Sequence, residues 1–167
     1  GEIARIYSGS NKQKLSRGKF PVYGSTGIIA YCNKPTYRKQ QILIARVGAN
    51  AGFTHLTTSD EYDVSDNTLI VDLNGIYNLK FIFHYLVNYN PNRLAKGGGQ
   101  PLITASEIKK IYIPIPPIEV QEKIVAILDR FEALVNDLTQ GLPAEIAAVR
   151  ERYEYYRNKL LTFKRIA

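Results

Sequence analysis

A cluster of three prolines, Pro114, Pro116 and Pro117, separates two parts of the chain that have different hydrophobic periodicities. Proline fixes φ and has no backbone N–H, so such a cluster interrupts strands and helices alike. Before it, short apolar and β-branched runs end in turn residues, which is typical of strands. After it, apolar residues recur every three or four positions, as on one face of a helix. We therefore predict an α+β chain, with a β-rich mixed domain over residues 1–118 and a long helical region over residues 119–167.

The first part carries signals for several strands and one helix. Residues 20–23 and 28–31 are apolar runs joined by a Gly-Ser-Thr-Gly turn, which predicts two short strands joined by a tight turn. Residues 77–88 have apolar side chains on one side of a helical pattern. Further strands are predicted over residues 41–47, 68–73 and 111–115.

The second part has heptad spacing, which is typical of helices that pack along their whole length against another helix. A Gly-Leu-Pro sequence at residues 141–143 predicts two helices of about 20 residues, folded back or kinked at that point. We predict that this two-segment coiled-coil region forms a dimer. An alternative is that the stripe packs only against the chain's own first domain or within a closed hairpin. The predicted dimerisation residues are Ile124, Leu128, Phe131, Leu138, Ile146, Val149, Tyr153, Tyr156 and Leu160.

The excess positive charge lies entirely in the first part. Residues 1–118 contain 14 Lys and Arg against 7 Asp and Glu, whereas residues 119–167 contain 8 of each. A basic domain joined to a neutral helical segment suggests that one part meets a polyanion and the other meets protein. The alternative is a solubilising surface without a partner.

Other sequence features indicate the cellular compartment and whether the chain is part of a longer protein. No apolar run approaches the roughly 20 residues of a membrane span, and no signal peptide opens the sequence. A single cysteine, Cys32, is consistent with a reducing cytoplasm. The chain contains no methionine, so we expect it to be a piece of a longer product.

No catalytic, metal-binding or cofactor-binding constellation is apparent, so we expect no catalytic residues, no metal and no cofactor. His55, His84 and Cys32 do not have the spacing of a zinc site, and we interpret both histidines as ordinary surface or core residues. The weak alternative is a Mg²⁺-dependent nuclease or hydrolase that uses Asp63, Asp66 and Glu107.

Five segments carry, in order, the likeness to a known family. They are residues 19–27 (KFPVYGSTG), 43–52 (LIARVGANAG), 99–117 (GQPLITASEIKKIYIPIPP), 118–124 (IEVQEKI) and 142–161 (LPAEIAAVRERYEYYRNKLL). Together they resemble one target recognition domain and one conserved helical region of the specificity subunits of Type I restriction-modification enzymes. Members of that family usually contain two of each, whereas this chain has one of each.

The resemblance implies a non-catalytic module that reads double-stranded DNA for methyltransferase and restriction subunits. It also implies a cytoplasmic protein and, if the chain acts alone, a homodimer whose antiparallel helices separate two recognition domains. Such a pair would read a split, palindromic site. The alternative is a basic module unrelated to restriction, with a dimerising helical tail, that binds RNA or an acidic protein.

Within the first domain, charge and polarity suggest which residues contact DNA. Phosphate contacts are expected from Lys12, Lys14, Arg17, Lys19 and Lys96. Base contacts are expected from Ser25, Thr26, Arg46, Asn50 and Arg93, since Arg pairs bidentately with guanine and Asn with adenine. For Arg46 and Asn50, the alternative is that their side chains hold the backbone of their own loop.

Overall fold

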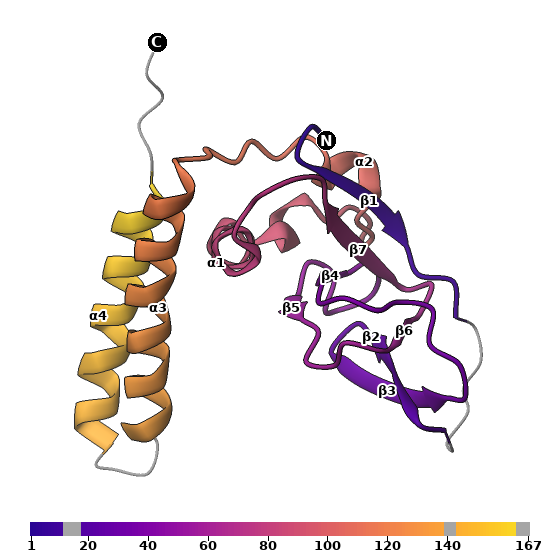
Figure 1. Ribbon diagram of the computed structural model, residues 1–167, viewed down its shortest axis with the longest axis horizontal. Helices are drawn as coiled ribbons and strands as arrows, with labels where there is room; N and C mark the ends of the chain where they lie inside the picture. The colour runs from indigo at the N-terminus through magenta and orange to yellow at the C-terminus, as the bar shows by residue number, and fades with distance from the viewer. Residues whose placement is uncertain (12–17, 139–142, 163–167) are drawn as a thin grey trace.

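The computed structural model describes residues 1–11, 18–138 and 143–162, with strands first and the long helices last (Figure 1). Three predicted phosphate contacts, Lys12, Lys14 and Arg17, lie outside the described residues. The side chains of two predicted dimerisation residues, Leu138 and Ile146, also lie outside them.

The strands form two small sheets. The larger has four strands in the order β1-β7-β4-β5, with all neighbours antiparallel. The smaller has three strands in the order β3-β2-β6, with β2 antiparallel to β3 and parallel to β6. The strand bounds are β1 (Ala4–Ser8), β2 (Phe20–Gly24), β3 (Gly27–Cys32), β4 (Ile42–Ala45), β5 (Thr54–Leu56), β6 (Asp63–Val64) and β7 (Thr68–Leu73).

The central strands are buried on both faces, which explains their continuous apolar sequences. All four residues of β4 are fully buried. On one face, Leu43 and Ile70 pack with Tyr62 in a buried cluster. The Tyr62 hydroxyl donates to the side-chain oxygen of Gln41 at 2.7 Å, so this buried polar group is satisfied.

On the other face, α1 (Leu79–Tyr89) covers the larger sheet. Phe81, Ile82 and Leu86 share a buried cluster with β4 residues Ile42 and Ile44. The helix begins at Asn78, whose side chain accepts from the Phe81 N–H at 3.1 Å, and it ends at Asn90 in the left-handed region. A short 3₁₀ helix η1 (Pro91–Leu94) and a one-turn helix α2 (Ala105–Ile108) follow.

The strand predicted over residues 111–115 is wrong. Residues 111–117 are all described, and they form neither strand nor helix. Pro114, Pro116 and Pro117 cannot donate to a sheet ladder, so the segment leaves the domain as an extended connection.

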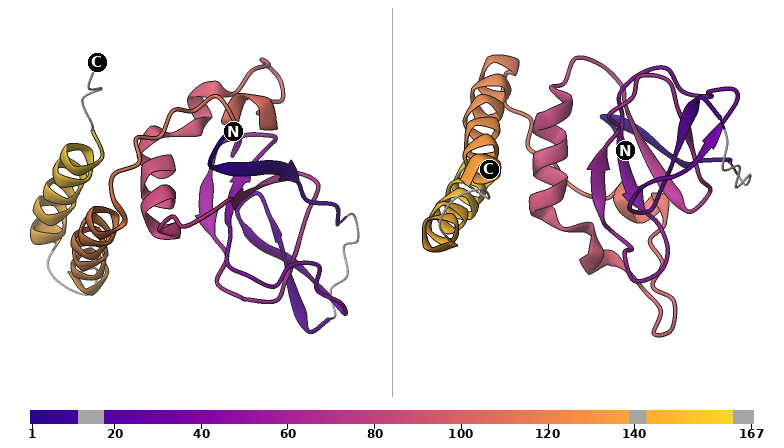
Figure 2. Two further views of the ribbon diagram at one scale, coloured as in Figure 1. Left: turned by 45° about the horizontal axis from the view of Figure 1, so that its top comes forward. Right: turned by 90° about the horizontal axis from the view of Figure 1, so that it is seen from below.

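The two long helices, α3 (Ile118–Leu138) and α4 (Pro143–Leu161), lie antiparallel and side by side (Figure 1). Figure 2 shows α1 between the sheet and this helical pair, which we call the helical hairpin. The ring of Phe131 on α3 stacks on that of Tyr156 on α4, with centroids 5.4 Å apart. No helix among the described residues is long and apolar enough to cross a membrane.

Part of the predicted dimerisation stripe is covered by the chain itself. Ile124 and Leu128 are buried in the same cluster as Phe81 and Ile82 of α1. The chain itself therefore covers these two side chains, and the exposed apolar residues of the hairpin are better placed to meet a second chain. The reason is that α1 presents its own apolar face to the first turns of α3. Val149, Tyr153 and Leu160 are half-buried in the hairpin, as is Phe131, whereas Tyr156 is exposed.

Candidate nucleic-acid interface

Strand pairing brings the ends of three strands to one edge of the larger sheet. The last residue of β1, Ser8, is paired with Leu69 near the start of β7, and the last residue of β4, Ala45, is paired with Thr68. The segments at this edge therefore come from three distant parts of the sequence. We call this edge, with the loops that extend from it, the loop edge.

Arg46 lies at the centre of the loop edge, directly after β4. Its guanidinium Nη1 donates to the Ser8 Oγ at 3.2 Å, and its backbone N–H donates to the Asn67 carbonyl at 3.0 Å. The Oγ of Ser25, in the turn between β2 and β3, donates to the same Asn67 carbonyl at 3.5 Å. Two predicted base-contacting residues, Ser25 and Arg46, are thus brought together, and Thr26 is exposed in the same turn.

Asn50 lies exposed in the tight loop that joins β4 to β5. The loop is held by backbone hydrogen bonds from Ala51 to the Gly48 carbonyl and from Phe53 to the Asn50 carbonyl, both at 2.9 Å. Gly48 and Gly52 have φ values of 82° and 93°. Residues other than glycine rarely adopt such positive φ values. The loop geometry therefore comes from the backbone, and no described contact uses the Asn50 side chain to hold it.

Two further segments flank this loop. The side-chain amide of Asn92, in η1, donates to the Ala51 carbonyl at 2.6 Å. Its neighbour Arg93 is exposed, with its guanidinium carbon 3.5 Å from the centre of the Tyr89 ring. On the other side, the Gly48 N–H donates to the Pro101 carbonyl and the Ile103 N–H to the Arg46 carbonyl, both at 2.9 Å.

The predicted phosphate contact Lys96 is already paired. Its Nζ lies 2.8 Å from the Glu107 Oε1, and Glu107 also accepts from the Thr104 N–H at 2.8 Å in a capping box at the start of α2. The hydrogen bond from Lys96, followed by those from Thr104, lowers the pKa of Glu107 to about 2. A phosphate must therefore compete with this carboxylate for Lys96. By contrast, Lys19 is exposed, 5.5 Å from the Phe20 ring centre.

Two of the three acidic residues of the nuclease alternative, Asp63 and Glu107, have structural roles. Asp63 is buried and accepts from the Asn11 side-chain amide at 2.7 Å and from the Val64 N–H at 2.8 Å. Glu107 caps α2. Among the described residues, one group of side chains could hold a metal ion, and it lies between α1 and α3. Asp63, Asp66 and Glu107 do not belong to it. The structure thus offers no support for a Mg²⁺ site of these three residues.

Two residues of the loop edge, Ser8 and Asn67, are absent from the sequence-based predictions. Ser8 ends β1 and Asn67 precedes β7, so both are polar residues at the ends of strands. That position is a usable signal for a surface loop. Their proximity to Arg46 depends on which strands pair, and local sequence patterns do not give that information.

A β domain that gathers polar loops on one edge, followed by a long helical hairpin, has the architecture of a recognition module. The chain belongs to the family described as "Type I restriction modification DNA specificity domain", whose model matches residues 1–148. It is 31% identical over 152 residues to a type I specificity subunit of Mycoplasma pneumoniae, covering 87% of this chain and 49% of the relative. It is 34% identical over 137 residues to a type I restriction enzyme specificity subunit of Haemophilus influenzae, covering 80% of this chain and 35% of the relative.

Solved structures show the same fold. The S subunit from Mycoplasma genitalium matches with a TM-score of 0.69 and 19% identity, over 83% of this chain and 39% of that subunit. The HsdS subunit from Thermoanaerobacter tengcongensis matches with a TM-score of 0.66 and 20% identity, over 96% of this chain and 43% of that subunit. The chain therefore spans about half the length, or less, of the relatives that it matches.

Proposed function

We propose that this chain is a DNA-reading module of a Type I restriction-modification system, equivalent to half of a specificity subunit. Its loop edge binds one half of a bipartite duplex target. The chain performs no chemistry and needs no cofactor, because methyltransferase and restriction subunits carry out methylation and cleavage. Membership of the DNA specificity family and the excess positive charge of residues 1–118 both support this role.

The observation that carries the proposal is the state of the Arg46 side chain. Its Nε atom is buried, yet it has no hydrogen-bond partner among the described residues. A buried, unsatisfied donor costs about 1–3 kcal/mol, and charged donors cost more. The residue as a whole is half-buried, and Ser8 holds its Nη1, so the guanidinium is positioned at the loop edge for an acceptor such as a guanine edge or a phosphate.

The other predicted DNA contacts fall into two chemical groups. Ser25, Thr26, Asn50 and Arg93 are proposed to contact bases or their surroundings, since they are polar and extend from loops. Lys19 and the undescribed Lys12, Lys14 and Arg17 are proposed phosphate contacts, which position the protein without reading the sequence. Lys96 is the weakest phosphate candidate, because Glu107 already neutralises it.

The helical hairpin is proposed to act as a spacer in a coiled-coil assembly with a second helical region. The 21 residues of α3 span about 32 Å at 1.5 Å per residue, close to one turn of DNA. Ile127 and Leu134 on α3 are 41% and 51% exposed, and Tyr155 on α4 is also exposed. A second copy of this chain would cover these side chains in a homodimer, and the methyltransferase subunits would dock on the same helical region.

The test is the substitution Arg46→Ala, measured by binding to a duplex that carries the cognate site and to random duplex DNA. We expect specific binding to weaken about 5- to 150-fold, corresponding to roughly 1–3 kcal/mol, with a smaller effect on random DNA. The matched control is Lys109→Ala. Lys109 is exposed and lies beside Gly1, at the opposite end of β1 from Ser8.

Equal losses on both duplexes would reduce Arg46 to a phosphate contact or a structural role. The alternative module, which binds RNA or an acidic protein, predicts no preference for a gapped duplex sequence. A selection from random duplexes that yields no such preference would favour that alternative.

A further inference from the structure

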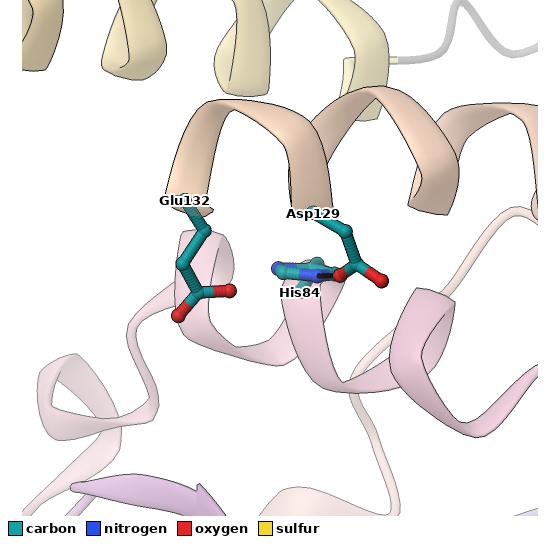
Figure 3. A group of neighbouring side chains, drawn as sticks. All are labelled: His84, Asp129 and Glu132. Atoms are coloured by element: carbon teal, nitrogen blue, oxygen red, sulfur yellow. Dashed lines mark ion pairs between the residues drawn. The ribbon is translucent and has the colours of Figure 1, made fainter. Parts of the chain in front are cut away.

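Three potential metal ligands meet where the recognition domain contacts the helical hairpin. His84 comes from α1, and Asp129 and Glu132 come from α3 (Figure 3). One ligand atom from each residue lies within 4.8 Å of the other two. The His84 Nε2 lies 3.6 Å from the Asp129 Oδ1.

The sequence holds this group in place through helix geometry and packing. Asp129 and Glu132 are three residues apart, so they lie on the same face of α3. Their neighbour Leu128 is fully buried in the cluster that contains Phe81 and Ile82 of α1, which fixes α3 against α1. His84 itself is only 3% exposed, whereas Glu132 is exposed. The imidazole therefore lies at the inner end of a group that opens to solvent.

We propose that His84, Asp129 and Glu132 bind a divalent transition-metal ion, with Zn²⁺ as the best chemical match. One imidazole nitrogen and two carboxylate oxygens are ligands that Zn²⁺ accepts, and three protein ligands leave a fourth position for water. This proposal does not follow from membership of the specificity family, and none of the three ligands is a proposed DNA contact.

The distances suit such an ion after a small adjustment. Tetrahedral Zn²⁺ with bonds of roughly 2.0–2.2 Å separates its ligand atoms by about 3.4 Å. The His84 and Asp129 atoms, at 3.6 Å, already match this spacing. The Glu132 carboxylate lies within 4.8 Å of both other ligand atoms, and its side chain is long and exposed, so it can adjust to the ion.

The surrounding charges also suit a cation. Lys80 Nζ lies 2.6 Å from the Asp129 Oδ2, so Lys80 holds one carboxylate oxygen while the other faces His84. Ligating carboxylates are commonly held by such outer partners. Two carboxylates and one ammonium leave a net negative charge.

The consequence of binding would be mechanical. The metal would join α1, which is part of the recognition domain, to α3, which begins the spacer. It would therefore fix the angle at which the hairpin leaves the domain.

The experiment is a titration of the whole chain, without a histidine tag, with Co²⁺ alone followed by competition with Zn²⁺. We expect binding of one ion per chain with the visible absorption of nitrogen- and oxygen-bound Co²⁺, and displacement by Zn²⁺. Loss of an outer partner alone weakens metal sites about 10- to 100-fold, so loss of a ligand in Glu132→Gln or Asp129→Asn should weaken binding at least as much. The matched control is Glu122→Gln, an exposed carboxylate on the same helix, which should bind as the unsubstituted chain does.

Circular dichroism of each variant checks that it is folded, and Glu132→Gln provides the cleanest test because Glu132 is exposed. Failure of the unsubstituted chain to bind at about 1 mM metal would overturn the proposal and leave a plain ion-pair group. Affinity that is unchanged in both ligand variants would also overturn it, as would a thiolate-to-cobalt band, which would assign the ion to Cys32.

Discussion

Gly52 lies where the loop that carries Asn50 meets η1, and a side chain there would meet the backbone of η1. A Cβ atom there would lie 2.2 Å from the Asn92 backbone nitrogen, and φ is 93°. We predict that Gly52→Ala destabilises the fold by about 2–4 kcal/mol, because backbone strain and overpacking add. Chemical denaturation measures this. Gly98→Ala is the control, since an added Cβ there meets no described atom within 4 Å, and its cost should be near zero.

Asp72 on β7 provides a test of pH dependence. Its carboxylate is 5% exposed and pairs with Arg5 at 2.6 Å and Lys39 at 2.5 Å. Burial alone raises the pKa of Asp72, but hydrogen bonds from Lys39 and Arg5 outweigh it and hold the pKa below the ordinary 3.8. A lowered pKa stabilises the fold above about pH 4, and this contribution is lost as the pH falls through the folded-state pKa.

We therefore predict that Asp72→Asn lowers the free energy of unfolding by about 1–2 kcal/mol at pH 7. The difference from the unsubstituted chain should shrink as the pH is lowered below 4, since the native carboxylate is then protonated as well. Urea denaturation at pH 7 and in acid measures both values. A difference that stays constant across this range would show that the ion pairs contribute nothing.

The site residues illustrate what a sequence can predict at this scale. Arg46 and Asn50 are recognisable because a basic and an amide side chain follow a buried strand in a glycine-containing loop. The pairing of Lys96 with Glu107 is not recognisable, because it depends on the close approach of two loops through the Lys96–Leu102 bridge. The group around His84 is hidden for the same reason, since its residues lie on two separate helices.

At the level of elements, the sequence pattern identifies the strands that are apolar and bounded by turns. The structure confirms the strand pair formed by β2 and β3, the strand β7 and the helix α1, with ends shifted by at most two residues. Three strands, β1, β5 and β6, are not predicted. Two of them, β5 and β6, have only three and two residues, which are too few to show a periodic pattern. The order β1-β7-β4-β5 depends on long-range pairing and cannot be read from local pattern.

Among the contacts between elements, the one between α1 and α3 is the main feature that the sequence does not predict. Leu128 is fully buried at this contact. We predict that Leu128→Ala destabilises the chain by about 2–5 kcal/mol, because it leaves a cavity in the shared core. Thermal and chemical denaturation measure the loss. Leu134→Ala, on the exposed part of the same helix, should change stability by less than about 0.5 kcal/mol.

If Leu128→Ala proved as mild as Leu134→Ala, the hairpin would not be fixed to the domain. The helices α1 and α3 would then move relative to each other, and the packing of Leu128 against α1 would not hold them together.

At the level of the whole molecule, the described chain covers only part of the apolar stripe of the hairpin. Its first turns face α1, and Leu134 remains exposed on the hairpin farther along α3. We predict that Leu134→Asp converts a homodimer to a monomer and leaves the β domain folded, because a buried carboxylate without a partner is strongly disfavoured. Sedimentation velocity measures the oligomeric state. Glu122→Gln, which changes an exposed residue of the same helix, should leave that state unchanged.

A purified chain that is monomeric at all concentrations would contradict the homodimer. In that case we would expect the exposed part of the hairpin to pack against a different helical partner, such as the second helical region of a longer subunit.

The loop after β4 owes its shape to main-chain hydrogen bonds and two glycines, while the side chain of Asn50 extends from it into solvent. Shape and chemical identity are therefore separable at this position. Under the proposed function, substitutions there would alter which bases are preferred while the scaffold keeps its stability. New target preferences would then be accessible through single changes, because selectivity and foldability would reside in different atoms.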